Sequence, residues 1–217
     1  PWDILDVHGA DALRWYLYTA SPPGNSRRFS ADLVAESARR TIATLWNTYS
    51  FFVTYANLAG FDPATPEAPS ARTELDRWVR SELHRTVRAV TEALDAYEPA
   101  DAGRPIADFI EELSNWYLRR SRRRFSRPES EADRQAALHT LYECLVTLSG
   151  LLAPFTPFVA EEMWRNLAAG RAGRPDSVHL SDFPEVHEAS IDPGLDEAGA
   201  MARKIVELGR RVRVDTK

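Results

Sequence analysis

The sequence predicts an all-α fold: an up-and-down helical bundle with a small N-terminal cap and a short C-terminal extension of one strand and a final helix. Three observations support this prediction. Four segments place apolar residues three and four positions apart, and prolines and glycines fall between these segments. The chain has 217 residues, of which 44% are apolar and 27% charged, enough to bury one sizeable core in a soluble, globular protein.

The four bundle segments follow one another with short breaks. The first covers residues 31–58, with apolar side chains at helical spacing over four turns. The second begins after Thr73, and the third runs from about residue 102 to residue 125. The fourth starts at Ser130, a good N-cap residue with Asp133 three positions on. Short connections between helices of this kind favour antiparallel neighbours.

The two ends of the chain differ from the bundle. Residues 1–29 contain two short helical stretches, Trp2–Val7 and Ala10–Thr19, followed by a turn-rich segment, SPPGNSRRFS. After a further helix at 157–169, the stretch Ser177–Leu180 alternates like a strand between two prolines. A last helix from about Leu195 runs to the C-terminus, so the chain is expected to be a piece of a longer protein.

Composition and motifs exclude several function classes. The single cysteine, Cys144, excludes an internal disulfide and fits a reducing compartment. The five histidines share no metal-ligand spacing, and no phosphate-binding loop, dinucleotide fingerprint or nucleophile elbow occurs. No segment is predicted to span a membrane or to act as a signal peptide. The sequence therefore predicts no catalytic residue, no metal site and no cofactor within this chain.

A cluster of arginines is the strongest functional signal. The net charge is −5, but residues 116–127 carry six arginines and no acid, so this segment holds +6 and the remainder −11. At 100° per residue, one arc of about 100° contains a tryptophan and four arginines. These are Trp116, Arg119, Arg120, Arg123 and Arg127. Arg124 continues the core stripe instead, and Arg122 points almost oppositely.

Two interpretations of this arginine ladder are open. Arginines in a row can neutralise backbone phosphates, and an aromatic ring beside them can stack on an exposed base, so the ladder fits RNA or DNA. Alternatively, it is a solvated helix face whose arginines pair with the chain's excess of acids, with Trp116 half-buried.

Five stretches, in this order, resemble isoleucyl-tRNA synthetases, a family of class I aminoacyl-tRNA synthetases. They are ADALRWYLYTASPP, LWNTYSFFVTYANLAGFDP, ELSNWYLRRSRRRF, LLAPFTPFVAEEMW and SVHLSDFP. The resemblance covers essentially the whole chain. The second and third stretches favour the isoleucine enzyme over its valine and leucine relatives, which remain an alternative. A second alternative is a structural bundle that docks an acidic protein.

The resemblance implies an anticodon-binding domain at residues 30–170, headed by a stem-contact-like cap at 1–29 that follows the catalytic domain. Residues 171–217 would connect to a further C-terminal region. The signatures HIGH and KMSKS are absent, so catalysis, ATP and Mg²⁺ would belong to another part of the protein. The implied partner is the anticodon arm of an isoleucine tRNA, bound by a cytoplasmic, monomeric protein without membrane contact.

The resemblance also assigns roles to residues. The ladder would contact phosphates, with Trp116 stacking on a loop base or packing beneath it. Arg27 and Arg28, in the polar turn between cap and bundle, are secondary candidates for the stem. Where the family commonly continues RRF with Trp, this chain has Ser126, which removes a stacking role at that position.

Overall fold

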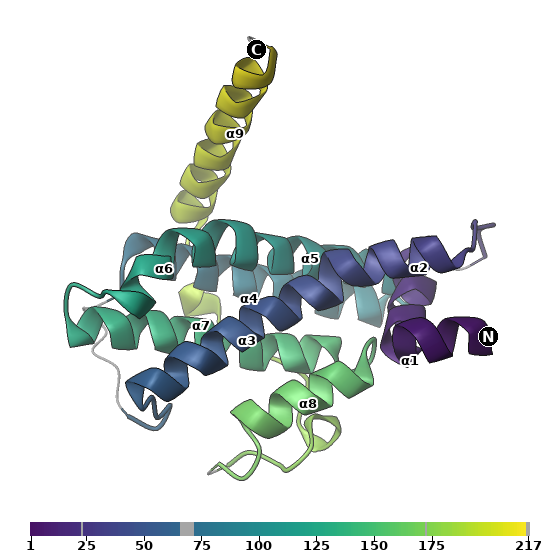
Figure 1. The fold of residues 1–217 in the computed structure, drawn as a ribbon, viewed down its shortest axis with the longest axis horizontal. Coiled ribbons are helices and arrows are strands. Elements are labelled where there is room, and N and C mark those ends of the chain that lie inside the picture. Colours follow the sequence, from purple (N-terminus) through teal and green to yellow (C-terminus); the bar gives the residue numbers. More distant parts are fainter. Residues whose placement is uncertain (23, 66–71, 172, 216–217) are drawn as a thin grey trace.

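The bundle is built from long helical rods. The computed structural model describes residues 1–22, 24–65, 72–171 and 173–215, with backbone only at 214–215. One rod consists of α2 (Ala31–Ala38), a π-helical turn η1 (Arg39–Ala43) and α3 (Thr44–Ala59). A second is α4 (Glu74–Asp95), and a third joins α5 (Pro99–Glu112), a π-helical turn η3 (Leu113–Leu118) and α6 (Arg119–Ser126). The fourth is α7 (Glu131–Leu152). All four predicted segments are therefore helical (Figure 1).

Local sequence explains where the rods begin. Ser130 caps α7 as predicted, because its side chain accepts a hydrogen bond from the backbone N–H of Asp133 at 3.1 Å. Thr73 and Asp76 form a reciprocal capping box at the start of α4. The third rod begins three residues earlier than expected, because Pro99 takes the first helical position, where its missing N–H costs nothing. Pro105 lies inside α5 without ending it.

The N-terminal segment packs across one end of the bundle. Helix α1 (Trp2–Thr19) is kinked at Gly9, whose φ of 81° and ψ of 164° separate the two predicted helical stretches. Its Trp15 belongs to the main core, and Tyr16 forms a smaller apolar cluster with Val34 of α2. Asp11 accepts hydrogen bonds from the backbone N–H groups of Phe158 and Val159, at the start of α8 (Pro157–Leu167).

The predicted strand at 177–180 is wrong. Residues Val178–Leu180 form a single 3₁₀ turn, η4, and no strand occurs among the described residues. The backbone N–H of Val178 donates to the Glu161 carboxylate of α8 at 3.0 Å, and the Ser177 hydroxyl donates to the same oxygen. Because a side chain of α8 satisfies this backbone, the segment does not need a strand partner.

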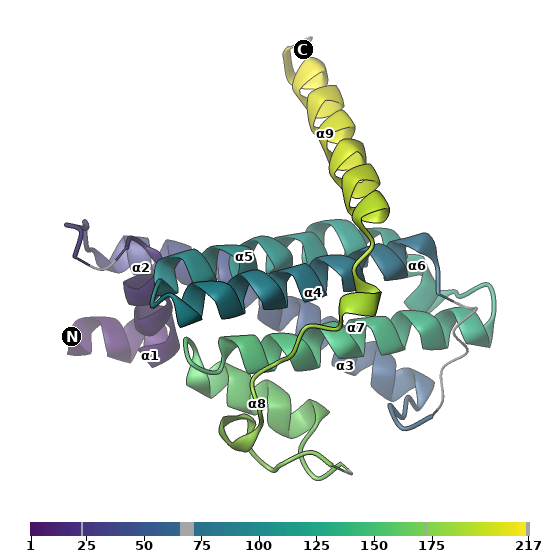
Figure 2. The ribbon, with the colours of Figure 1, turned by 180° about the vertical axis from the view of Figure 1, so that it is seen from behind.

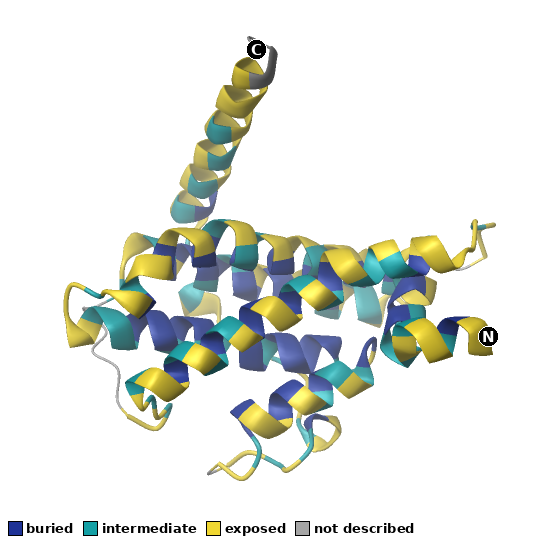
Figure 3. Ribbon diagram, in the orientation of Figure 1, coloured by how far each residue is buried: buried dark blue, intermediate teal, exposed yellow. Residues whose placement is uncertain are grey.

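The predicted last helix is present as α9 (Pro193–Asp215), which follows a short 3₁₀ turn, η5 (Glu188–Ser190). It stands away from the bundle in both views of the ribbon (Figures 1 and 2). Most of its length is exposed, whereas the inward faces of the bundle helices are buried (Figure 3). The division into residues 1–29, 30–170 and 171–217 stays a prediction.

Candidate nucleic-acid interface

The rod α5–η3–α6 carries the predicted arginine ladder. The π-helical turn at 113–118 contains one more residue than an α-helical turn and so rotates the residues that follow it. As a result Tyr117 and Leu118, which are neighbours in sequence, are both buried. Beyond the turn, Ser121 and Phe125 face the core. The arginines on the other side of α6 are thereby turned toward solvent.

The structure places the ladder residues unequally. Arg119, Arg120 and Arg123 are exposed on α6. Arg127 is exposed too, but it lies just past the end of the helix, with a non-helical φ of −145° and ψ of 67°. Arg127 therefore does not continue the helical arc that the uniform 100° spacing predicts.

Trp116 is half-buried against the core, and its ring contacts an arginine. The guanidinium carbon of Arg120 lies 3.1 Å from the indole centroid, and Arg120 donates a hydrogen bond to the Trp116 carbonyl at 3.4 Å. This cation–π contact holds the Arg120 guanidinium over the Trp116 ring.

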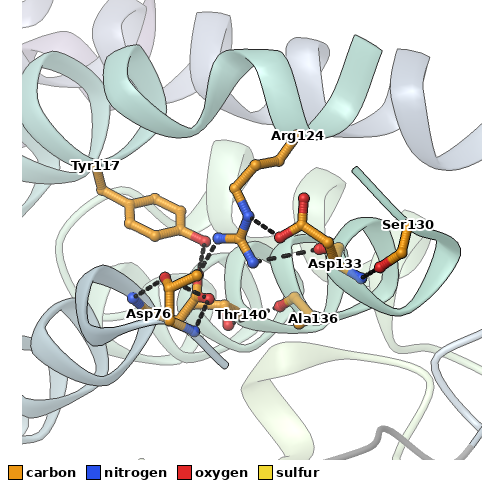
Figure 4. A network of polar contacts seen from close by, with 8 residues as sticks. Asp76, Tyr117, Arg124, Ser130, Asp133, Ala136 and Thr140 are labelled. Carbon is orange, nitrogen blue, oxygen red and sulfur yellow. Dashed lines mark hydrogen bonds and ion pairs between the residues drawn. The ribbon is translucent and has the colours of Figure 1, made fainter. Parts of the chain in front are cut away.

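Arg124 fixes the orientation of α6. Its guanidinium donates to Asp76 of α4 at 2.7 Å and to Asp133 of α7 at 2.6 Å (Figure 4). Burial alone would lower the pKa of Arg124, but the bonds to Asp76 and Asp133 raise it. The Tyr117 hydroxyl donates to the same Asp76 oxygen at 2.7 Å. Arg124 is thus a structural residue of the core stripe, as the sequence predicts, and three helices are tied together through its side chain.

The exposed arginines are not neutralised by acids. Within the described part of the chain, Arg119, Arg123 and Arg127 have no carboxylate within ion-pairing distance. Arg122 points to α3, where its guanidinium lies 5.4 Å from the ring centroid of Phe51. Arg124, which lies outside the ladder, is the arginine of this segment that pairs with the chain's own acids. Arg119, Arg123 and Arg127 remain available to an external anion.

The two secondary candidates lie far from the ladder. Arg27 and Arg28 occupy the connection between α1 and α2, at the opposite end of the bundle from α6 (Figure 1). Arg27 donates to the carbonyl of Leu17, and the Arg28 carbonyl accepts from the Tyr16 hydroxyl. The structure therefore does not join these arginines to the ladder.

The described residues offer few candidates for a metal site or a reactive cysteine. Among the described residues, no group of three His, Cys, Asp or Glu side chains could hold a metal ion, and no helix is long and apolar enough to cross a membrane. Burial raises the pKa of the Cys144 thiol, which lies in the core.

One part of the basic surface escaped sequence reasoning. Burial, the charge of Arg119 and the charge of Arg210 on α9 together lower the pKa of the Arg120 guanidinium, so Arg210 adds to the basic surface around Arg120. Ninety positions separate the two arginines, and no local pattern in the sequence connects them.

The helical bundle and its exposed arginine face define the class of protein to which the chain belongs. The family described as the anticodon-binding domain of tRNA ligase matches residues 76–217, and the chain belongs to this family.

Its relatives are isoleucine–tRNA ligases, which confirms the resemblance drawn from the motifs. The enzyme of Dehalococcoides mccartyi is 53% identical over 214 residues, covering 98% of this chain and 21% of the relative. That of Thermus thermophilus is 49% identical, with 98% and 21% covered, and that of Streptomyces coelicolor is 43% identical, with 100% and 20% covered. The chain thus spans about a fifth of the length of these relatives.

A solved structure shares the fold. The LeuRS chain of Agrobacterium radiobacter, in a ternary complex with tRNA and LeuAMS, matches with a TM-score of 0.62 at 20% identity. The match covers 88% of this chain and 21% of that one.

Proposed function

We propose that this chain holds the anticodon stem and loop of an isoleucine tRNA, as part of a cytoplasmic isoleucine–tRNA ligase. Aminoacylation, with its ATP and Mg²⁺, would take place in another part of a longer polypeptide, as the chain's share of its relatives' length suggests. The chain itself needs no cofactor for this role, and we expect it to act as a monomer.

The exposed, unpaired arginines of α6 carry the proposal. Arg119 and Arg123 lie one helical turn apart on the same face, so both can reach phosphates of one RNA strand. Because Arg124 anchors the helix to α4 and α7, these arginines are presented by a rigid element. Guanidinium groups bind phosphate oxygens in a bidentate manner, which orients the RNA as well as attracting it.

The other candidate RNA-binding residues would have supporting roles. Trp116, with Arg120 against its ring, would stack on or pack beneath a loop base, and Arg127 would extend the phosphate contacts past the helix end. Arg27 and Arg28, at the other end of the bundle, would meet the stem rather than the loop. Since the whole chain is acidic, RNA is expected to approach through the basic face, because the acidic surface repels it.

A binding titration tests the proposal. The chain is titrated against an isoleucine-tRNA anticodon stem-loop, a loop-scrambled version and the valine and leucine stem-loops, at several salt concentrations. Tighter binding to the isoleucine loop, with affinity that falls steeply as salt rises, is expected. Equal affinity for every polyanion, including heparin, would instead favour a bundle that docks an acidic partner.

A further inference from the structure

Helix α9 carries an apolar stripe that the bundle does not cover. Met201, Ile205 and Leu208 follow one another at a spacing of four and then three residues, so at 100° per residue they fall within an arc of about 60°. Their side chains are 57%, 61% and 51% exposed. As far as the structure describes the chain, none of the three belongs to the main core or to the smaller apolar cluster. Apolar side chains in a row on one helix face are typical of a surface that packs against another element.

The opposite face of α9 holds the helix to the bundle. Arg203 pairs with Glu112 of α5 at 3.1 Å. Gly199 lies so close to the ring of Trp78 on α4 that an added Cβ would come within 2.4 Å of Nε1. On the helical wheel, Gly199 and Arg203 lie about 180° from the centre of the apolar stripe. The stripe therefore points away from the bundle, on a helix whose root is fixed (Figure 2).

The residues that border the stripe suit a helical partner. Ala198, Ala202 and Gly209 are exposed and lie on one side of it, where their small size lets a second helix approach closely. Lys204 lies on the other side and is also exposed, so an acidic residue of the partner is favoured there. The surface thus fits the apolar face of an amphipathic helix.

The stripe is too small to hold a separate molecule. A stable interface between two proteins buries about 800 Å² per partner, contributed by about 20–30 residues a side, and three apolar side chains fall far short of this. A segment of the same polypeptide needs less contact area, because the tether raises its effective concentration at the stripe. The relatives leave room for such a segment, since the match covers 98% of this chain but 21% of the Dehalococcoides mccartyi enzyme.

We propose that an amphipathic helix of the C-terminal region, into which residues 171–217 are expected to lead, packs its apolar face on Met201, Ile205 and Leu208. This helix starts near the outer end of α9 and returns antiparallel to it, as in an αα-hairpin. The fixed root of α9 then sets the orientation of that region relative to the bundle. The inference rests on one part of the proposed function, that the chain belongs to a longer polypeptide, and it does not require RNA binding.

Photocrosslinking in the longer polypeptide tests the inference. The photoreactive residue p-benzoylphenylalanine replaces Ile205 in one variant and Ala200 in a control, because Ala200 is also exposed on α9 but lies outside the stripe. The proteins are irradiated without RNA, and the joined peptides are identified by mass spectrometry. We expect position 205 to cross-link, within one polypeptide, to a segment that follows residue 217, and the control to lose this product. No cross-link at 205, or a cross-link to a second copy or to a segment before residue 1, would overturn the proposal.

Amide hydrogen exchange gives a second readout. Ile205→Asp and the control Ala200→Asp add the same charge at exposed positions of α9, so neither should unfold the bundle. In the longer polypeptide, Ile205→Asp should speed exchange in the docked segment about tenfold, and Ala200→Asp should leave it unchanged. Equal exchange in the two variants would overturn the proposal. Neither measurement uses RNA, so the proposed function stands if both fail, whereas it falls if the unchanged chain does not bind the stem-loop.

Discussion

Replacing Asp76 by alanine removes the acceptor at the centre of the network that fixes α6. The Asp76 carboxylate is fully buried and accepts four hydrogen bonds. Two come from the backbone N–H and hydroxyl of Thr73, each at 2.8 Å, and two from Tyr117 and Arg124, each at 2.7 Å. The substitution leaves a buried hydroxyl and a half-buried guanidinium without this partner.

The expected loss of unfolding free energy is about 3–5 kcal/mol, the usual cost of removing one member of a buried ion pair. Loss of the capping box, which by itself costs about 0.5–2 kcal/mol, is part of this total. Arg124 keeps its bond to Asp133, which places the expected value toward the lower end.

Urea unfolding at neutral pH measures the effect, in a double-mutant cycle of Asp76→Ala, Arg124→Ala and the double variant. Coupled residues of one network should give an interaction free energy of about 1–3 kcal/mol. A loss below about 1 kcal/mol for Asp76→Ala, or additive single losses, would refute the argument that this network anchors the basic helix.

Two further predictions concern acid stability and the root of α9. Burial opposes ionisation of Glu143, but the His84 ring, whose Nε2 lies 3.6 Å from the carboxylate, and two hydrogen bonds from Arg80 lower the pKa of Glu143 from 4.5 to about 2. The ionised Glu143 should therefore stabilise the fold by about 3 kcal/mol above pH 4.5, and this stabilisation should be lost as the pH falls toward 2. Urea unfolding midpoints measured between these pH values should decline less in Glu143→Gln than in the unchanged chain. At Gly199, a Cβ would lie 2.4 Å from Nε1 of Trp78, so Gly199→Ala should loosen the root of α9 and cost about 1–3 kcal/mol. At Gly209 a Cβ would meet nothing within 4 Å, so Gly209→Ala should leave the free energy of unfolding equal or raise it. Amide hydrogen exchange across residues 193–203 should be faster in Gly199→Ala, and faster exchange only in Gly209→Ala would contradict this account.

The helices could be predicted because their signal is local. Apolar spacing, Ser130 as an N-cap and the prolines between segments act within a few residues, so the rods and their order follow from sequence. The predicted strand failed because its backbone is satisfied by Glu161, a contact with another helix that residue alternation does not reveal.

The candidate site was predictable only in part. A helical wheel with uniform spacing finds Arg119, Arg120 and Arg123, but it does not show that the helix ends before Arg127. The pairing of Arg124 with two aspartates also depends on packing, although its position in the core stripe does not.

The central claim, that α6 grips RNA phosphates, is tested most directly by the salt dependence of binding. The unchanged chain and Arg119→Ala/Arg123→Ala are titrated with the anticodon stem-loop between 50 and 200 mM salt, beside Arg165→Ala/Arg171→Ala, which removes the same charge at and just beyond α8. Loss of two phosphate contacts should flatten the slope of log K against log salt by about 1.4–1.8, while the control keeps its slope. An unchanged slope in the folded α6 variant, or equal flattening in both variants, would contradict the account.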